Sequence, residues 1–161
     1  MSRRLVIFDA DGTLVDTVED VAECFNQALV AAGYPSSTLE GVSAQLGKPL
    51  EEIVRGILPP DVAREDAAVT AVSQAYRKAY ASSPKSRTRP YPGVSKALRQ
   101  LLDSGMQIAV NSNKPHDNLV RLMDRFFSDL PLLVSGYGNV GVKSAKPDPE
   151  GARWLMTKAK V

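Results

Sequence analysis

A short apolar run that stops at two carboxylates places the strongest constraint on the fold of this chain. Residues 5–8 (LVIF) are apolar at every position, and the turn sequence DADG follows them directly at residues 9–12. Because the run offers apolar side chains to both of its faces, it predicts a strand of a parallel sheet that is covered on both sides. A chain of 161 residues can supply that cover in one domain with a small insertion.

Composition excludes several classes of protein. Lys and Arg total 20 against 18 Asp and Glu, and this net charge of +2 lacks the one-sided electrostatic field of a dedicated nucleic-acid binder. Residues 5–8 are shorter than the ~7–15 apolar residues of a secretory signal, and no stretch approaches the ~20 apolar residues of a membrane span. Cys24 is the only cysteine, which suits a reducing compartment. We therefore expect a cytoplasmic protein without nucleic-acid or membrane partners.

The stretch from residue 17 to about residue 80 predicts helices and no strand. Apolar residues with three-four spacing indicate an amphipathic helix over residues 18–32, and Thr17 and Asp20 are expected to form a capping pair at its start. Two more helices are expected within this stretch.

The residues after this first helix predict a loop, two further helices and a polar segment. Residues 41–49 are expected to form a loop, and the further helices are expected over residues 50–58 and 62–80. The polar, proline-containing and basic segment 82–90 is typical of a solvated hinge, with a basic binding patch as the alternative.

Helix and strand patterns alternate after residue 92. Helices are expected over residues 94–102 and 119–127, strands over 106–110 and 132–134, and a last helix with Asp148 as N-cap and Pro149 at its first position. With the first strand, this order predicts an α/β protein with a Rossmann-like parallel sheet core. The core is expected to consist of residues 1–16 and 89–161, and residues 17–88 are expected to form a helical insertion.

Polar residues follow the expected strands at the point where each strand ends. Asp9 and Asp11 follow the first strand, Ser112 and Asn113 follow the second, and Lys146 comes later. Ligands of open α/β sheets gather at the carboxyl ends of the strands. One carboxylate there can attack an electrophile while its neighbour exchanges a proton. Mg²⁺ is the natural cation for such a pair, since it combines one or two carboxylates with phosphate oxygens. A hydroxyl and an ammonium group would hold the phosphate itself.

Each of these residues also has an ordinary structural interpretation. Asp-x-Asp-Gly on its own is usually a turn, Ser112 could cap the next helix, and Lys146 could lie on the surface. An EF-hand calcium loop is excluded, because Leu14 stands where that loop requires glycine. His116, the only histidine, receives no role.

Three ordered motifs together resemble the haloacid dehalogenase superfamily. They are LVIFDADGTLVDT at residues 5–17, VNSNK at residues 110–114 and AKPDP at residues 145–149. Within the superfamily the motifs are most similar to those of phosphoglycolate phosphatase-type hydrolases, and the helical insertion is similar to the cap domain. The resemblance spans essentially the whole chain. It implies the haloacid dehalogenase fold and a phosphatase that hydrolyses a small phosphorylated metabolite.

The resemblance also implies roles for the motif residues. Asp9 would attack the phosphorus of a monoester, and Asp11 would protonate the leaving oxygen and then help to activate water. Asp9 and Asp11 would hold Mg²⁺, the latter through its backbone carbonyl. Ser112 would bind a phosphoryl oxygen, and Lys146 would neutralise the nucleophile and the phosphate.

Substrate recognition is less defined by the motifs. Asn113 is expected to help place the substrate. Lys48, in a turn of the insertion, is a candidate for binding a substrate carboxylate or second phosphate, with an exposed solvated lysine as the alternative. Residues 15–16 and 89–90 are the expected hinges of cap closure.

The family's fourth motif, Gly-Asp-x-x-x-Asp on a further strand, does not occur in the sequence. We therefore expect a truncated phosphatase whose C-terminal core strands are absent, with an incomplete Mg²⁺ shell and impaired turnover. The first strand would keep an unpaired apolar edge that favours self-association. The alternatives are a non-catalytic phosphate-ligand or protein-binding module derived from such a phosphatase, and a phosphosugar mutase, although VNSNKP is more similar to the hydrolase version.

Overall fold

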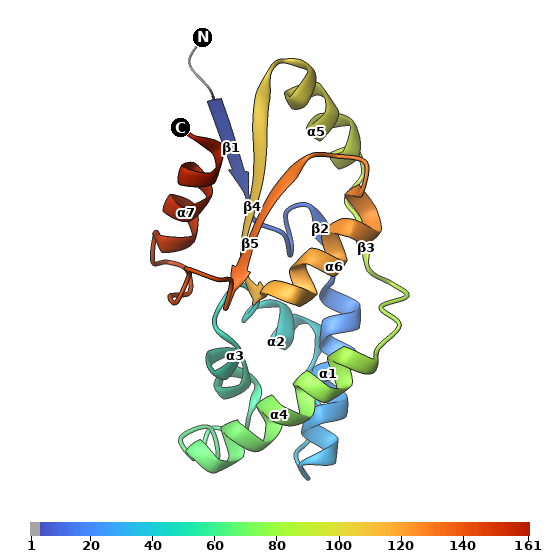
Figure 1. Ribbon diagram of the computed structural model, residues 1–161. Coiled ribbons are helices and arrows are strands. Elements are labelled where there is room, and N and C mark those ends of the chain that lie inside the picture. Colours follow the sequence, from blue (N-terminus) through green and yellow to red (C-terminus); the bar gives the residue numbers. More distant parts are fainter. Residues whose placement is uncertain (1–3) are drawn as a thin grey trace. The chain divides into compact units, whose positions relative to one another are not determined.

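The computed structural model describes residues 4–161, which form two compact units. One unit holds the described residues up to Asp16 together with Arg89–Val161, and the other holds Thr17–Thr88. Every strand lies in the first unit, here called the α/β unit, whereas the second is built from helices and is called the helical unit (Figure 1). None of the helices in residues 4–161 has both the length and the apolar character needed to cross a membrane.

Three parallel strands form the sheet of the α/β unit, in the order β1-β4-β5. They are β1 (Arg4–Phe8), β4 (Met106–Pro115) and β5 (Leu132–Tyr137). The predicted α/β class and parallel sheet are confirmed. Both β4 and β5 continue beyond the apolar runs that predict them, because Asn111 and Ser112 still pair with Ser135 and Gly136 of the neighbouring strand.

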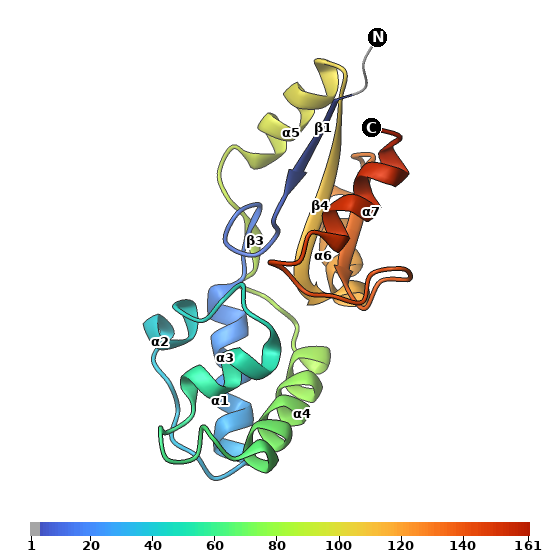
Figure 2. The same cartoon turned by 90° about the vertical axis from the view of Figure 1, so that its left-hand side faces the viewer.

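Helices cover the two faces of this sheet. They are α5 (Val94–Asp103), α6 (His116–Phe127) and α7 (Glu150–Ala159). Leu98 of α5 and Leu119 of α6 share a buried core with Ile108 and Val110 of β4. Since side chains alternate along a strand, Gln107 points to the other face, where its amide donates to the Ala159 carbonyl at 3.0 Å. Figure 1 shows α5 and α6 on one side of the sheet and α7 on the other, and Figure 2 gives the view along the layers.

The start of α7 differs by one residue from the prediction. Pro149, not Asp148, occupies the N-cap position, and the helix begins at Glu150. Asp148 nevertheless stabilises this end, since its carboxylate accepts a hydrogen bond from the Glu150 N–H at 2.8 Å. Gly151 allows the helix to approach β4 closely, because a Cβ atom there would lie 2.6 Å from the Asn111 side-chain oxygen.

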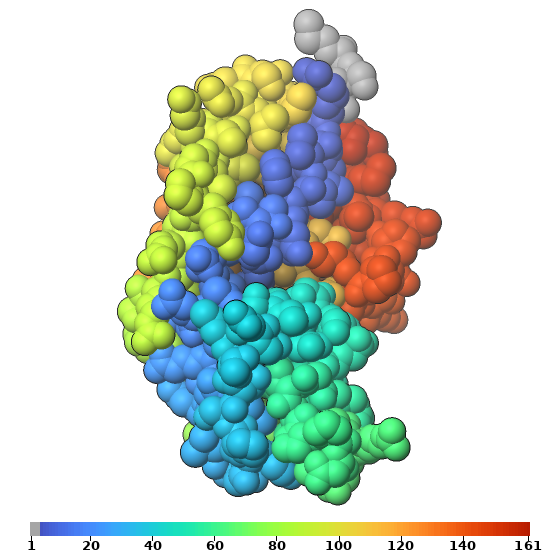
Figure 3. Space-filling view, turned by 180° about the vertical axis from the view of Figure 1, so that it is seen from behind, coloured from blue at the N-terminus to red at the C-terminus, as the bar shows by residue number. Residues whose placement is uncertain are grey.

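Strand β1 lies at one edge of the sheet and has β4 as its only strand neighbour within residues 4–161. The residues from Leu5 to Phe8 are half-buried, whereas Ile108, Ala109 and Val110 of β4 are fully buried. In the space-filling view, the blue segment that contains β1 reaches the surface between the yellow and red parts of the chain (Figure 3). The apolar edge of this strand is therefore accessible.

The helical unit consists of four helices packed around its own core. They are α1 (Val18–Ala31), α2 (Leu39–Ser43), α3 (Leu50–Ile57) and α4 (Asp66–Ser82). Phe25 of α1 stacks on Tyr76 of α4, with ring centroids 3.9 Å apart. The prediction of a loop over residues 41–49 is wrong at its start, because the Thr38 side chain caps α2 by accepting from the Gly41 N–H at 3.0 Å.

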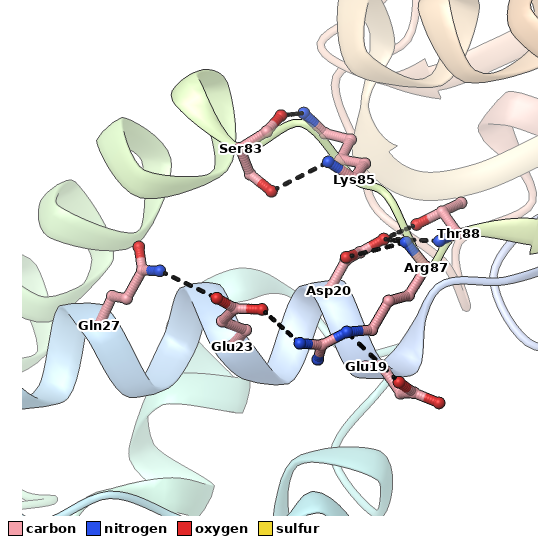
Figure 4. Close-up of polar contacts among 8 residues, drawn as sticks. All are labelled: Glu19, Asp20, Glu23, Gln27, Ser83, Lys85, Arg87 and Thr88. Atoms are coloured by element: carbon pink, nitrogen blue, oxygen red, sulfur yellow. Dashed lines mark hydrogen bonds and ion pairs between the residues drawn. The ribbon is translucent and has the colours of Figure 1, made fainter.

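Asp20 does not form the predicted capping pair with Thr17, since the start of α1 has no side-chain cap bond. Its buried carboxylate instead accepts from both the N–H and the hydroxyl of Thr88 at 2.6 Å, and from the Arg87 N–H at 3.1 Å. The Arg87 guanidinium group forms ion pairs with Glu19 and Glu23 (Figure 4). The first turn of α1 is therefore tied to the last residues of the helical unit.

A second, shorter link joins the corresponding segments of the α/β unit. Strand β2 (Val15–Asp16) pairs antiparallel with β3 (Arg89–Pro90). The chain thus runs from β2 into the helical unit at Thr17 and returns into β3 at Arg89. These four strand residues are the positions that the sequence predicts as hinges.

Candidate active site

Asp9 lies at the carboxyl end of β1, where the chain turns sharply. The turn is closed by hydrogen bonds from the Leu14 N–H to the Ala10 carbonyl and from the Gly12 N–H to the Val15 carbonyl, each 2.9 Å long. Gly12 has a φ of +76°, a conformation that costs glycine little and other residues more. The Asp9 carboxylate accepts from the Ala10 N–H at 2.7 Å. This turn fixes the carboxylate at the end of the sheet.

Lys146 comes from the loop between β5 and α7, and its ammonium group lies 2.9 Å from Asp9 Oδ2. The two side chains are 29% and 34% exposed, so solvent and a small ligand can reach the pair. The resulting site combines an oxygen nucleophile with a cation that can stabilise an anionic ligand. Residues 137 positions apart in the sequence are thus brought together as predicted.

Asn113 fixes the backbone of the lysine that pairs with Asp9. Its side-chain oxygen accepts from the Lys146 N–H at 2.6 Å, and its amide nitrogen donates to the Lys146 carbonyl at 3.1 Å. Glu150 holds the preceding residues, since one carboxylate oxygen accepts from the Lys143 and Ser144 N–H groups, each at 2.7 Å. Hydrogen bonds from Ser144 and Lys143 lower the pKa of the Glu150 carboxyl. The loop is therefore held from β4 and from α7.

Asp11 lies two residues beyond Asp9 and has a different cation beside it. The Lys114 ammonium group is 3.2 Å from Asp11 Oδ1, and the two side chains are only 7% and 16% exposed. Sequence reasoning did not select Lys114. The signal that could have found it is its position in the Ser112–Lys114 segment, directly at the carboxyl end of the central strand.

Ser112 and Lys48 complete the set of predicted site residues. Ser112 is buried at the carboxyl end of β4, and its hydroxyl oxygen accepts from the Lys114 N–H at 3.1 Å. Lys48 belongs to the helical unit, where its ammonium group donates to the Gln45 side-chain oxygen at 2.7 Å. The structure therefore joins Asp9 and Asn113 through Lys146, whereas Asp11 contacts Lys114. Ser112 adjoins the Asp11–Lys114 pair through the Lys114 backbone.

The oxygen donors of this site suit a hard cation. Asp9 offers a carboxylate and Asp11 a backbone carbonyl oxygen, and Mg²⁺ is commonly held by one or two carboxylates together with water and substrate phosphate. No group of three or more His, Cys, Asp or Glu side chains in the described part of the chain could hold a metal ion. The residues present thus fit a Mg²⁺ ion that depends on ligand phosphate for much of its coordination.

Comparisons with known proteins agree with this arrangement. The family model described as haloacid dehalogenase-like hydrolase matches residues 6–161. A phosphoglycolate phosphatase of Pseudomonas putida is 33% identical over 98% of this chain and 58% of its own length, and one of Cereibacter sphaeroides is 30% identical over 92% of this chain and 68% of its own length. The chain thus spans little more than half of the first of these relatives.

Solved structures share the fold. A putative phosphoglycolate phosphatase from Lactobacillus delbrueckii superposes with a TM-score of 0.88 at 24% identity, over 100% of this chain and 75% of that one. The family match over nearly the whole sequence, together with the strand-end carboxylates and their lysine partners, establishes that this chain belongs to the haloacid dehalogenase-like hydrolase family.

Proposed function

We propose that the α/β unit carries the phosphoryl-transfer site of a phosphatase that hydrolyses a small phosphomonoester. The observation that carries this proposal is the 2.9 Å contact between the Asp9 carboxylate and the Lys146 ammonium group at the end of β1. A phosphoryl group beside Asp9 would meet a nucleophilic oxygen and a cation that opposes the negative charge of the transferring oxygens. Family membership supports the same chemistry.

In the first half of the proposed reaction, an Asp9 oxygen attacks phosphorus and the ester P–O bond breaks. The Asp11 carboxylic acid gives its proton to the departing oxygen, so that an alcohol leaves and Asp9 carries the phosphoryl group. Lys146 opposes the charge on the phosphoryl oxygens, and the Ser112 hydroxyl donates a hydrogen bond to one of them. Because the Asn113 side chain bonds both the N–H and the carbonyl of Lys146, the ammonium group is placed before the substrate arrives.

In the second half, water attacks the phosphorus of the aspartyl phosphate. Asp11, now a carboxylate, takes a proton from this water as the P–O bond to Asp9 breaks. Phosphate leaves, Asp9 returns to its carboxylate form, and Asp11 is again the acid. Mg²⁺ held by Asp9 and Asp11 would neutralise charge on the phosphoryl group during both halves.

The names of the relatives and a lysine of the helical unit support a proposal for the substrate class. Relatives named phosphoglycolate phosphatase support a small phosphorylated acid as substrate. We propose that the helical unit acts as the cap over the site, and that Lys48 binds the substrate's carboxylate or second phosphate. An exposed ammonium group of this kind can exchange its Gln45 contact for a ligand at little cost.

Phosphate release from a panel of monoesters tests the function. We expect release from phosphoglycolate and similar small alkyl phosphates when Mg²⁺ is present, and loss of that release on chelation, because one carboxylate and one backbone carbonyl bind the ion weakly. The second candidate is a module that binds phosphate ligands without turnover, which the small number of acidic side chains in the described site favours. Binding of inorganic phosphate by calorimetry without release from any ester would identify that module and contradict the phosphatase.

The accessible edge of β1 supports a further proposal about assembly. An unpaired edge with half-buried apolar residues is a template for pairing with another strand, and we propose that a second copy of this chain covers it. Light scattering over a range of protein concentrations is expected to give a mass that rises from one chain towards two. A single-chain mass at every concentration would contradict this pairing.

A further inference from the structure

Lys114 is a nearly buried lysine that the proposed reaction does not yet use. Its side chain is 7% exposed, and its ammonium group lies 3.2 Å from the Asp11 carboxylate. A buried ammonium ion is costly unless it is paired with an opposite charge. The ion pair with Asp11 therefore stabilises this ammonium group, and Lys114 contributes to the position of the Asp11 carboxylate.

The backbone of Lys114 is also fixed by its neighbours. Its N–H donates to the Ser112 hydroxyl oxygen at 3.1 Å. On the β5 side, Gly136 approaches so closely that a Cβ atom there would lie 2.6 Å from the Lys114 carbonyl oxygen. The lysine therefore extends from the end of β4, where its backbone is held by Ser112 and lies close to Gly136 of β5.

The two ion pairs of the site differ in their access to water. The side chains of Lys146 and Asp9 are 29% and 34% exposed, whereas those of Lys114 and Asp11 are 7% and 16% exposed. Water screens the first pair more strongly, so Lys146 can turn from Asp9 to an incoming phosphate at modest cost. The second pair is better shielded, and its geometry is expected to persist while a ligand binds.

We propose that Lys114 is the positioning residue for Asp11. Its contact with Oδ1 fixes the rotation of the carboxyl group and thereby determines which oxygen gives the proton to the leaving group and takes it back from water. This inference rests on the proposed phosphatase function and adds to it a residue that acts through the acid rather than on the phosphate.

Leaving groups of different basicity provide the test. A Lys114→Met chain is expected to lose about 10- to 100-fold in kcat for a small alkyl phosphate, which needs a proton on its leaving oxygen. For p-nitrophenyl phosphate we expect kcat to fall by less than about 3-fold, because p-nitrophenolate leaves without protonation. This expectation applies when transfer of the phosphoryl group to Asp9 is the rate-limiting step. Lys114→Arg keeps the cation and should recover part of the lost rate. Equal losses on both esters would overturn the proposal.

A double-mutant cycle separates positioning from general damage to the fold. In an Asp11→Asn chain, the further change Lys114→Met should reduce the rate with the alkyl phosphate by less than about 2-fold, since the group that Lys114 positions is already gone. Full multiplication of the two losses would contradict the inference. Lys96→Met removes an exposed lysine of α5 and is the matched control, for which we expect the unaltered rate.

Failure of the proposed function remains distinguishable from failure of this inference. If the unaltered chain releases no phosphate from any ester, the phosphatase proposal and the positioning role of Lys114 both fail. If it releases phosphate but the Lys114→Met chain shows no difference between the two esters, only the positioning role fails. Urea unfolding of the four cycle proteins checks the contact itself, and strictly additive shifts of the midpoints would contradict it.

Discussion

Replacing Asp9 by asparagine is expected to reduce phosphate release by at least about 1,000-fold, or about 4 kcal/mol of transition-state stabilisation. Asparagine preserves the shape of the side chain and can still accept from the Ala10 N–H. It offers a neutral amide in place of the carboxylate oxygen beside the Lys146 ammonium group, and an amide is a poor nucleophile at phosphorus. The measurement is kcat with a small alkyl phosphate and Mg²⁺, together with mass spectrometry of the acid-quenched protein for a phosphoryl group on Asp9.

Asp103→Asn is the matched control for this substitution. Asp103 is an exposed carboxylate at the end of α5, just before the amino end of β4, and its replacement is expected to leave kcat within about 2-fold. The folded state of the Asp9→Asn chain is checked by circular dichroism. A properly folded Asp9→Asn chain that retains a tenth or more of the original rate would exclude Asp9 as the nucleophile.

Local patterns predict the elements of this fold better than their ends. The apolar run at residues 5–8 makes up β1 except for Arg4, because its hydrophobic content and its backbone pairing nearly coincide. Strand β4 instead continues through polar residues such as Ser112, since the neighbouring β5 supplies backbone partners there. The hydrophobic pattern does not show which backbone groups have partners on a neighbouring strand, so the length of β4 could not be predicted from it.

In the site too, the positions of residues at strand ends could be predicted, whereas some of the contacts of their side chains could not. Asp9, Asp11 and Lys146 are predictable because a parallel sheet brings the ends of its strands to one edge. The contact of Asn113 with the Lys146 backbone and that of Lys114 with Asp11 depend on side-chain directions, which the spacing of residues does not determine. Asn113 therefore has an observed structural role, and its predicted contact with substrate stays a prediction.

Asp20 illustrates how a local interpretation fails when a distant partner is available. Its position in the first turn of α1 favours a capping role, but the Arg87–Thr88 segment offers three donors to the same carboxylate from 67 and 68 residues away. A buried carboxylate that accepts several hydrogen bonds is more strongly stabilised than a helix cap exposed to solvent. The segment that the sequence describes as a solvated hinge is consequently anchored at its end.

An Asp20→Ala substitution is therefore expected to destabilise the helical unit by about 3 kcal/mol. Each buried donor left without an acceptor costs roughly 1–3 kcal/mol, and some of the donors that lose Asp20 form hydrogen bonds with water instead. Asp20→Asn keeps one acceptor oxygen and should lose less, whereas Glu19→Ala removes an exposed carboxylate of the same turn and should cost below about 0.5 kcal/mol. Urea unfolding followed by circular dichroism measures these differences. Faster hydrogen exchange of the Thr88 amide in Asp20→Ala is the local signature of the lost bond. A loss below about 1 kcal/mol with unchanged exchange would mean that Asp20 does not anchor this segment.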